Sequence, residues 1–296
     1  MLLHSHIKFW LNFLTSSPKK KIIQLSDKEQ ERLENYLRLN TFEIPREYLK
    51  PVNSVSPFKK SYYSYDWYRI FSTTDTRLCF HAFGDINKNL DYPGLTKSRP
   101  ISLCSNNVLL PLETARHFDF VEDNRLFTSK FDQAVWRGAA YQKHRQKFLQ
   151  QTSNSIYGDF ADTSHLTKKN KFTKPQEFMS IQNQLNYKFI VSLEGNDVAS
   201  NLKWIMASNS IAIMPKPKME TWFSERHLVA NQHYIEISDD FTNIDEKIEY
   251  FLEHPKECKE INAEAKRYCE PFFDLERQYQ LGMIVADRYF ESISTI

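Results

Sequence analysis

The chain has 296 residues, of which 41% are hydrophobic and 26% charged, and this composition excludes a disordered chain, a collagen and a coiled coil. Its length is about twice a typical domain of ~150 residues, which predicts two domains. There are 39 Lys and Arg against 37 Asp and Glu, and a net charge of +2 counts against a general polyanion binder, so no nucleic-acid partner is expected.

Glycine and cysteine are both scarce. Only 6 of the 296 residues are glycine, against an average of about 7%, which argues against a fold built on repeated glycine loops. Cys79, Cys104, Cys258 and Cys269 are too few and too irregularly spaced for a disulfide framework or a zinc site. We therefore expect free thiols, a reducing compartment and no metal site.

The N-terminal segment predicts an amphipathic helix. Apolar residues recur at helical spacing over residues 7–14, and three lysines follow at 19–21. This order of apolar and basic parts is the reverse of a signal peptide. Such a helix can lie on an anionic membrane surface or dock on the protein's own core. No run of ~18 apolar residues occurs, so no membrane span is predicted.

The rest of the first half predicts short elements. Ser26 and Glu29 form a capping box that opens a helix. Residues 41–66 are rich in proline and aromatic residues. Together with Trp67 and Tyr68, which follow, they predict a loop. Strands are expected at residues 69–71, 78–83, 108–110 and 118–121.

The second half alternates strands and helices. Strands are predicted at residues 134–136, 187–193, 210–214 and 233–237, and helices at 143–149, 198–207 and from Asn243 onward. This alternation is typical of parallel βαβ units. It predicts an α/β fold with its ligand at the carboxyl ends of the strands.

Residues 189–204 form the most informative segment, a strand followed by a tight turn and a helix. Gly195 permits the turn, and Asn196 or Asp197 can cap the helix. The first N–H groups of such a helix can hold a phosphate without a G-x-G-x-x-G motif, which the chain lacks. An ordinary capped helix gives the same pattern.

A series of short motifs is spread over residues 65–275. The motifs are Phe83-Gly84-Asp85, Lys97-Ser98-Arg99-Pro100-Ile101, Arg116-His117-Phe118, Trp136-Arg137-Gly138, the run from Lys188 to Asn209, Pro215-Lys216-Pro217, Glu220-Thr221-Trp222-Phe223 and His233-Tyr234-Ile235. In this order they resemble glycosyltransferase family 90, most closely its bacterial lipopolysaccharide-core members. The combination is more specific than any one of the motifs.

The resemblance implies a GT-B architecture, in which two Rossmann-like domains face each other across a cleft. It implies an acceptor-side domain over residues 1–130, a nucleotide-sugar-binding domain over 131–275, and a C-terminal helix over 276–296 that packs back on the first domain. The family uses nucleotide-sugar donors, usually UDP-linked, and inverts the anomeric carbon without a bound metal or other cofactor.

The resemblance also implies a set of donor-binding residues. Protein O-glucosyltransferases of the family have a Ser and then an Arg after the Trp/Phe-Arg-Gly turn; the matching positions here are Ala139, which has no hydroxyl, and Arg145. Where these relatives end the donor segment with an Arg, this chain has Asn201, and Lys203 could supply the charge. The expected donor-binding residues are Arg137, Gly138, Ala139, Arg145, Gly195, Asn196, Asp197, Val198, Ala199, Ser200, Asn201 and Lys203.

Direct displacement at the anomeric carbon requires a carboxylate that accepts the proton of the attacking hydroxyl. The family's base lies at the position that matches Asp85, directly after a predicted strand. Asp91 is a rival, because Tyr92-Pro93 follows it as in the O-glucosyltransferases. Arg137 and Arg145 suit the leaving diphosphate, although Arg137 could instead form a structural ion pair.

Lys97, Arg99, Arg116 and His117 form a basic group expected to bind an anionic acceptor, unless they are scattered over the surface. Together these features predict a hexosyltransferase that moves glucose or galactose from a UDP-sugar to an inner-core sugar of lipopolysaccharide, most simply a heptose. It would work in the cytoplasm, with peripheral contact at the inner membrane. The alternatives are a protein O-glycosyltransferase and a non-catalytic module that binds carbohydrate or nucleic acid.

Overall fold

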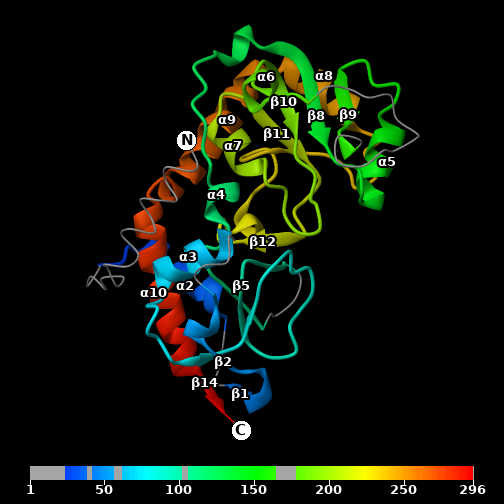
Figure 1. Cartoon of the computed structure of the whole chain (residues 1–296). Coiled ribbons are helices and arrows are strands. Elements are labelled where there is room, and N and C mark those ends of the chain that lie inside the picture. Colours follow the sequence, from blue (N-terminus) through cyan, green and yellow to red (C-terminus); the bar gives the residue numbers. More distant parts are fainter. Residues whose placement is uncertain (1–23, 39–41, 57–61, 102–105, 165–177, 296) are drawn as a thin grey trace. The chain divides into compact units, whose positions relative to one another are not determined.

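A computed structural model describes residues 24–38, 42–56, 62–101, 106–164 and 178–295 (Figure 1). The chain forms two compact units, the first from residues 1–115 and 274–296 and the second from residues 116–273. The predicted helix over residues 7–14 and Cys104 lie outside the described residues. The assignment of acceptor and donor sides to two domains stays a prediction.

The first unit is built from short strands and three longer helices. Strands β4, β5 and β7 form a parallel sheet, β2 pairs with β3 antiparallel, and β1 pairs with β14 in parallel. The helices are α2 (Asp27–Leu37), α3 (Tyr62–Ile70) and α10 (Leu275–Ser292), and the strands are β1 (Phe42–Ile44), β2 (Lys50–Pro51), β3 (Leu78–Cys79), β4 (His81–Ala82), β5 (Gly94–Thr96), β6 (Ser98–Pro100), β7 (Asn107–Leu109) and β14 (Ile293–Thr295). Helix α10 packs against α2 and α3. The short helix α4 (Thr114–His117) spans the boundary between the units.

The second unit is a five-stranded parallel sheet with helices packed on it. Its helices are α5 (Lys143–Gln151), α6 (Ile181–Gln184), α7 (Leu202–Ala207), α8 (Ile244–Glu253) and α9 (Pro255–Cys269). The strands of the sheet are β8 (Phe131–Gly138), β9 (Gly158–Asp162), β10 (Tyr187–Val191), β11 (Ile211–Met214) and β13 (Ile235–Glu236), and β12 (Met219–Thr221) lies outside it. Alternate residues of the strands, such as Phe189 and Val191, share one buried core with Phe148 of α5 and Ile248 of α8. The α/β class with parallel sheets is therefore confirmed.

Two predictions in the first half are wrong. Residues 62–70 form helix α3 rather than a loop and a strand, because the helix buries Trp67 and Ile70, and the Trp67 indole donates to the Val52 carbonyl at 3.1 Å. Residues 118–121 form no strand. The ring of Phe118 instead packs on that of Phe272, with centroids 5.8 Å apart, and so anchors a loop.

The capping box at Ser26 and the helix after it are confirmed.

The described cysteines Cys79, Cys258 and Cys269 are free and buried. Burial raises the pKa of the Cys79 and Cys258 thiols to about 12 and also raises that of Cys269.

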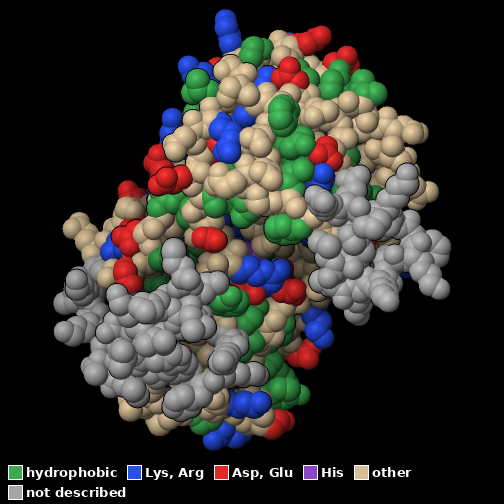
Figure 2. Space-filling view, turned by 45° about the horizontal axis from the view of Figure 1, so that its top comes forward, with side chains coloured by type: hydrophobic (Ala, Val, Ile, Leu, Met, Phe, Trp, Pro, Cys, Tyr) green, Lys and Arg blue, Asp and Glu red, His purple; other side chains and the backbone are tan. Residues whose placement is uncertain are grey.

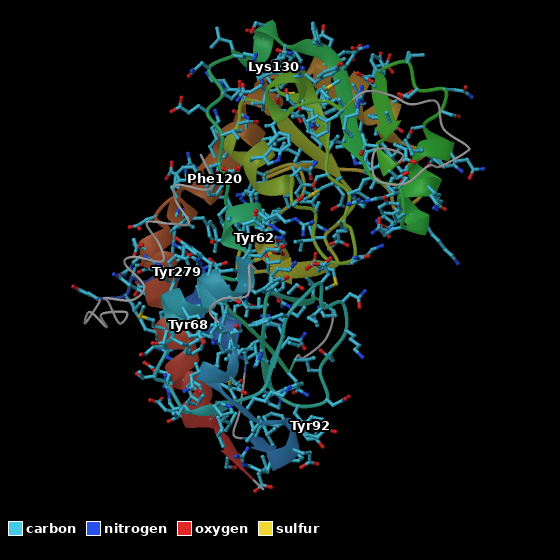
Figure 3. All side chains as sticks on the ribbon, viewed as in Figure 1. Tyr62, Tyr68, Tyr92, Phe120, Lys130 and Tyr279 are labelled. Carbon is cyan, nitrogen blue, oxygen red and sulfur yellow. The ribbon has the colours of Figure 1, made fainter. Side chains whose placement is uncertain are left out.

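A buried carboxylate joins three parts of the first unit. Asp66 of α3 accepts hydrogen bonds from the Thr114 N–H (2.8 Å), the Thr114 hydroxyl (2.7 Å) and the Tyr279 hydroxyl (2.6 Å). Tyr279 belongs to α10 and is labelled in Figure 3. Burial of Asp66, opposed by these hydrogen bonds, raises its pKa to about 6.

This raised pKa predicts how stability depends on pH. Because folded Asp66 binds its proton more tightly than unfolded Asp66, its contribution is fully present below pH 3.8 and is lost as the pH rises through about 6. The loss amounts to about 3 kcal/mol. We expect the unfolding free energy of the wild type to fall relative to that of Asp66→Asn between these pH values, as measured by urea denaturation. A difference that stays constant or rises with pH would contradict this prediction.

Candidate active site

The order of the strands in the second unit indicates where a ligand binds. The sheet runs β13-β11-β10-β8-β9, so the first strand in the chain, β8, lies between the second, β9, and the third, β10. This is the doubly wound order whose ligands bind outside the carboxyl ends of the strands, where the chain reverses its direction along the sheet. Here that switch point lies between β8 and β10.

Arg145, at the start of α5, ties together the two loops that leave the switch point. Its guanidinium donates to the Ala139 carbonyl after β8 (3.0 Å) and to the Leu193 and Glu194 carbonyls after β10 (2.8 and 2.9 Å). No carboxylate of the described residues forms an ion pair with it, so its charge is not neutralised by direct contact. Burial lowers the pKa of Arg145, and the nearby Arg116 lowers it further, but an arginine remains cationic. The switch point therefore carries a fixed positive charge.

The loop after β10 is held by its own side chains. Asn201 donates to the Val191 carbonyl at 3.0 Å and accepts from the Ser192 hydroxyl at 3.0 Å. Gly195 makes a backbone bond to the Asp197 carbonyl at 2.9 Å, and the Asn196 side chain accepts from Gln142 at 3.1 Å. Thus Asn201 fastens the loop to its strand.

The helix after this loop begins later than the sequence predicts. Helix α7 starts at Leu202 after Asn201, rather than at Val198, and is only 6 residues long. The expectation that Asn196 or Asp197 caps it is therefore wrong. The reason is that Val198 and Ala199 are buried in the loop instead of continuing a helical face.

A pocket of about 160 Å³ opens beside this loop, at the carboxyl ends of β10 and β11. Its wall is apolar on one side, with Val198, Ala199 and Phe241, and polar on the other, with Glu194 and Lys216. This volume is below the ~300–1,000 Å³ of a typical ligand site. The second unit by itself therefore encloses room for only part of a larger ligand.

Glu194 and His144 line this pocket and were not predicted. The Glu194 carboxylate accepts the Lys218 and Met219 N–H groups at 2.9 and 3.0 Å, and burial raises its pKa. His144 contacts the Glu194 carbonyl through Nε2 at 2.7 Å. Their only signal in the sequence was their position, since His144 precedes Arg145 and Glu194 precedes Gly195.

Arg137 and Lys203 each form an ion pair with a carboxylate of the second unit. Arg137, at the end of β8, forms an ion pair with Asp159 at 2.6 Å and also donates to the Asp159 and Trp136 carbonyls. Lys203 forms an ion pair with Glu225 at 2.6 Å, and both side chains are 1% exposed. These contacts favour structural roles, so binding of the diphosphate by either residue stays a prediction.

The other predicted donor residues belong to the two loops. Gly138 ends β8, and the Ala139 carbonyl accepts a hydrogen bond from Arg145. Ser200 lies half-buried in the loop.

The first unit gathers charged side chains at the carboxyl ends of its three-stranded sheet. Asp85 follows β4, Lys97 follows β5 and Glu113 follows β7. The Lys97 ammonium lies 2.7 Å from Asp85 Oδ1 and 2.8 Å from Glu113 Oε2. Tyr63 donates to the same Glu113 oxygen at 3.2 Å. A carboxylate that is partly open to solvent is thus held by a buried lysine.

The predicted acceptor residues lie in different surroundings. Arg99 is fully buried and donates to the Asn35, Tyr36 and Asn107 carbonyls. His117 is also buried, and Arg116 is exposed. Lys and Arg side chains are interspersed with Asp and Glu on the face that Figure 2 shows, in keeping with the small net charge. Acceptor binding by these residues stays a prediction, and of the four only Arg116 is exposed.

Gly84, next to Asp85, has a backbone conformation that other residues rarely adopt, with φ of +108°. A Cβ there would meet no atom within 4 Å, so the cost of a side chain is backbone strain alone. We expect Gly84→Ala to lower the unfolding free energy by about 1 kcal/mol. We also expect it to lower kcat, because the strained backbone would shift the neighbouring Asp85 carboxylate. Thermal unfolding and steady-state kinetics would measure both effects, and unchanged kcat and stability would contradict the prediction.

The described residues contain neither a metal-binding cluster nor a membrane-spanning helix. No group of His, Cys, Asp or Glu among them could hold a metal ion. Within that same part of the chain, no helix is both long and apolar enough to cross a membrane.

The sequence model of glycosyl transferase family 90 matches residues 115–291. The chain belongs to this family of glycosyltransferases, as its resemblance in sequence predicted. It is 39% identical over 234 residues to the O-glucosyltransferase LpsA of Dichelobacter nodosus, which covers 78% of this chain and 73% of that protein. A shorter match is to Uncharacterized protein 179R of Invertebrate iridescent virus 6, with 27% identity over 103 residues, or 32% of this chain and 8% of that protein.

Proposed function

We propose that the protein is a metal-independent, inverting hexosyltransferase that moves a sugar from a UDP-sugar to an inner-core sugar, most simply a heptose, of bacterial lipopolysaccharide. The observation that carries the proposal is the cationic Arg145 at the switch point of a doubly wound sheet, beside a partly apolar pocket. The name of the Dichelobacter nodosus relative favours glucose over galactose as the sugar.

In this proposal the two units share the work as the domains of a GT-B enzyme do. The second unit binds the donor, with the diphosphate near Arg145 and part of the nucleotide in the pocket next to Glu194. The first unit binds the acceptor and supplies Asp85. The parallel sheets in both units support this assignment.

The reaction needs a base and a stabilised leaving group. Asp85 accepts the proton of the acceptor hydroxyl while that oxygen forms its bond to the anomeric carbon. The bond from this carbon to the diphosphate breaks at the same time, and the electron pair leaves with UDP. Arg145 stabilises the negative charge that grows on the departing oxygen. Because attack and departure occur on opposite faces, the anomeric configuration inverts.

The experiment is a transfer assay on the full chain with UDP-glucose and UDP-galactose. The acceptor is lipopolysaccharide truncated at its heptose, and a protein acceptor serves as the comparison. We expect UDP release that depends on the truncated acceptor, a product of inverted configuration by NMR, and no loss of rate in EDTA. Transfer to the protein acceptor alone would instead indicate a protein O-glycosyltransferase.

A binding measurement tests the donor class separately. A ligand at about 100 times its Kd stabilises a protein by about 2.7 kcal/mol, so UDP and the correct UDP-sugar are expected to raise Tm. Binding of oligosaccharide or polynucleotide with no effect of any UDP-sugar on Tm would favour the non-catalytic module.

Since the proposed acceptor is lipid-linked, we also propose peripheral contact at the cytoplasmic face of the inner membrane. Co-sedimentation of the protein with anionic vesicles would measure this contact.

A further inference from the structure

A buried lysine with two carboxylate partners stands next to the proposed base. The Lys97 side chain is 1% exposed, that of Glu113 is 9% exposed and that of Asp85 is 29% exposed. Exposure thus increases from the lysine to Asp85. Only Asp85, of these three, offers substantial surface to an acceptor from solvent.

The charges of this cluster do not cancel. A buried ammonium needs one carboxylate to offset the cost of removing it from water, and Glu113, itself nearly buried, supplies it at 2.8 Å. The second contact, to Asp85 Oδ1 at 2.7 Å, therefore exceeds what neutralisation of Lys97 requires. It fixes the direction of this carboxylate, while Ser98 holds the loop itself by exchanging hydrogen bonds with the Ile86 backbone.

Backbone strain at Glu113 indicates that its position beside Lys97 serves a function. Glu113 has φ of +60°, in the left-handed region, which costs a residue with a side chain about 1–2 kcal/mol. The adjacent Thr114 is held by its hydrogen bonds to Asp66. Strain of this kind persists where the surroundings enforce it, and it is concentrated at functional sites.

We propose that Lys97 is a positioning residue for catalysis, which holds Asp85 through Oδ1 and keeps it ionised, while Glu113 limits how strongly Lys97 does so. This rests on the proposed function, in which Asp85 is the base. Lys97 neither gives nor takes a proton. The acceptor's proton moves to Asp85, and the ammonium stays bonded to that carboxylate throughout the transfer.

Two neighbouring groups among the described residues, Tyr63 and His81, carry no charge in the assay range. Tyr63 lies with its ring centroid 5.9 Å from the Lys97 ammonium, and burial raises its pKa to about 12. Burial lowers the pKa of His81, on the strand that leads to Asp85, to about 4. Neither ring therefore adds a charge to those of Lys97, Asp85 and Glu113 between pH 5 and 9.

The decisive variant is the double substitution Lys97→Met with Glu113→Gln, because it removes both buried charges and leaves neither unpaired. An ammonium in contact with a carboxylate lowers its pKa by about 1–3. We therefore expect the acid limb of kcat against pH to move up by about one pH unit or more. Loss of orientation is expected to lower kcat about tenfold or more. KM for the UDP-sugar should stay within about twofold, since donor contacts are untouched.

The single variant Glu113→Gln should have an effect opposite to that of the double variant. It leaves Lys97 facing Asp85 alone, so the acid limb of kcat against pH should move to lower pH. In a separate comparison, Lys97→Arg should restore much of the kcat that Lys97→Met loses. Lys88→Met, which removes an exposed charge from the loop that carries Asp85, is the matched control and should leave the limb in place.

A merely structural ion pair gives a different result. If the double variant folds, as judged by Tm and by its UDP-induced shift, and keeps the wild-type kcat and acid limb, the proposal is overturned. Failure of the proposed function is recognised separately, because the wild type would then release no UDP in response to the acceptor. An Asp85→Asn variant that retains the wild-type kcat would show that Asp85 is not the base, whatever happens at Lys97.

Discussion

Asp85→Asn is expected to lower kcat about 10²–10⁴-fold, the usual contribution of a general base. The amide preserves the size of the side chain but cannot accept the proton of the acceptor hydroxyl. KM for the UDP-sugar and the thermal shift with UDP should be nearly unchanged, because the donor is assigned to the other unit. The measurement is initial-rate kinetics of acceptor-dependent UDP release.

Asp91→Asn is the matched control for this prediction. Asp91 lies exposed on the same long loop, and Asn106 donates to its backbone carbonyl rather than to its carboxylate. We expect its kcat to stay near that of the wild type. If Asp91→Asn loses activity and Asp85→Asn keeps it, the base is Asp91.

Arg145→Met is expected to lower kcat/KM for the UDP-sugar about 10²-fold or more, because the charge that faces the leaving diphosphate is removed. It should also lower the unfolding free energy by about 2–4 kcal/mol, since three carbonyl groups lose hydrogen bonds to a charged donor. Both effects are expected because the side chain that binds the two loops is also the one proposed to face the diphosphate.

Lys143→Met provides the control for Arg145, since Lys143 is an exposed cation on the same helix. It should leave kcat/KM and the urea midpoint nearly unchanged. A wild-type kcat/KM in a folded Arg145→Met variant would remove Arg145 from the donor site.

The sheet of the second unit was predictable because local signals agree there. The strands that became β10 and β11 are continuous apolar runs bounded by turn residues, as buried parallel strands are. Strand β9 was missed because Gly-Asp-Phe-Ala-Asp has no such run. Its position depends on pairing with β8 over residues 134–138, which local sequence does not reveal.

Helix α3 could not be predicted, because its helical state is decided by distant partners. Its Tyr and Trp residues have modest helix propensity, and their burial depends on segments such as α10, more than 200 positions away in the chain. The same reason hid the ion cluster of Lys97, since its carboxylates come from separate loops at residues 85 and 113. The motifs identified Asp85 and Arg145 as candidates, but only the fold revealed what each one contacts.

The bonds that Arg145 makes have a consequence for how the protein can diverge. All three end on backbone carbonyls, which every amino acid possesses. The side chains at positions 139, 193 and 194 can therefore change without breaking the link between the two loops. If the proposed donor site is correct, mutation can in this way remodel these loops for a new substrate while Arg145 stays in place.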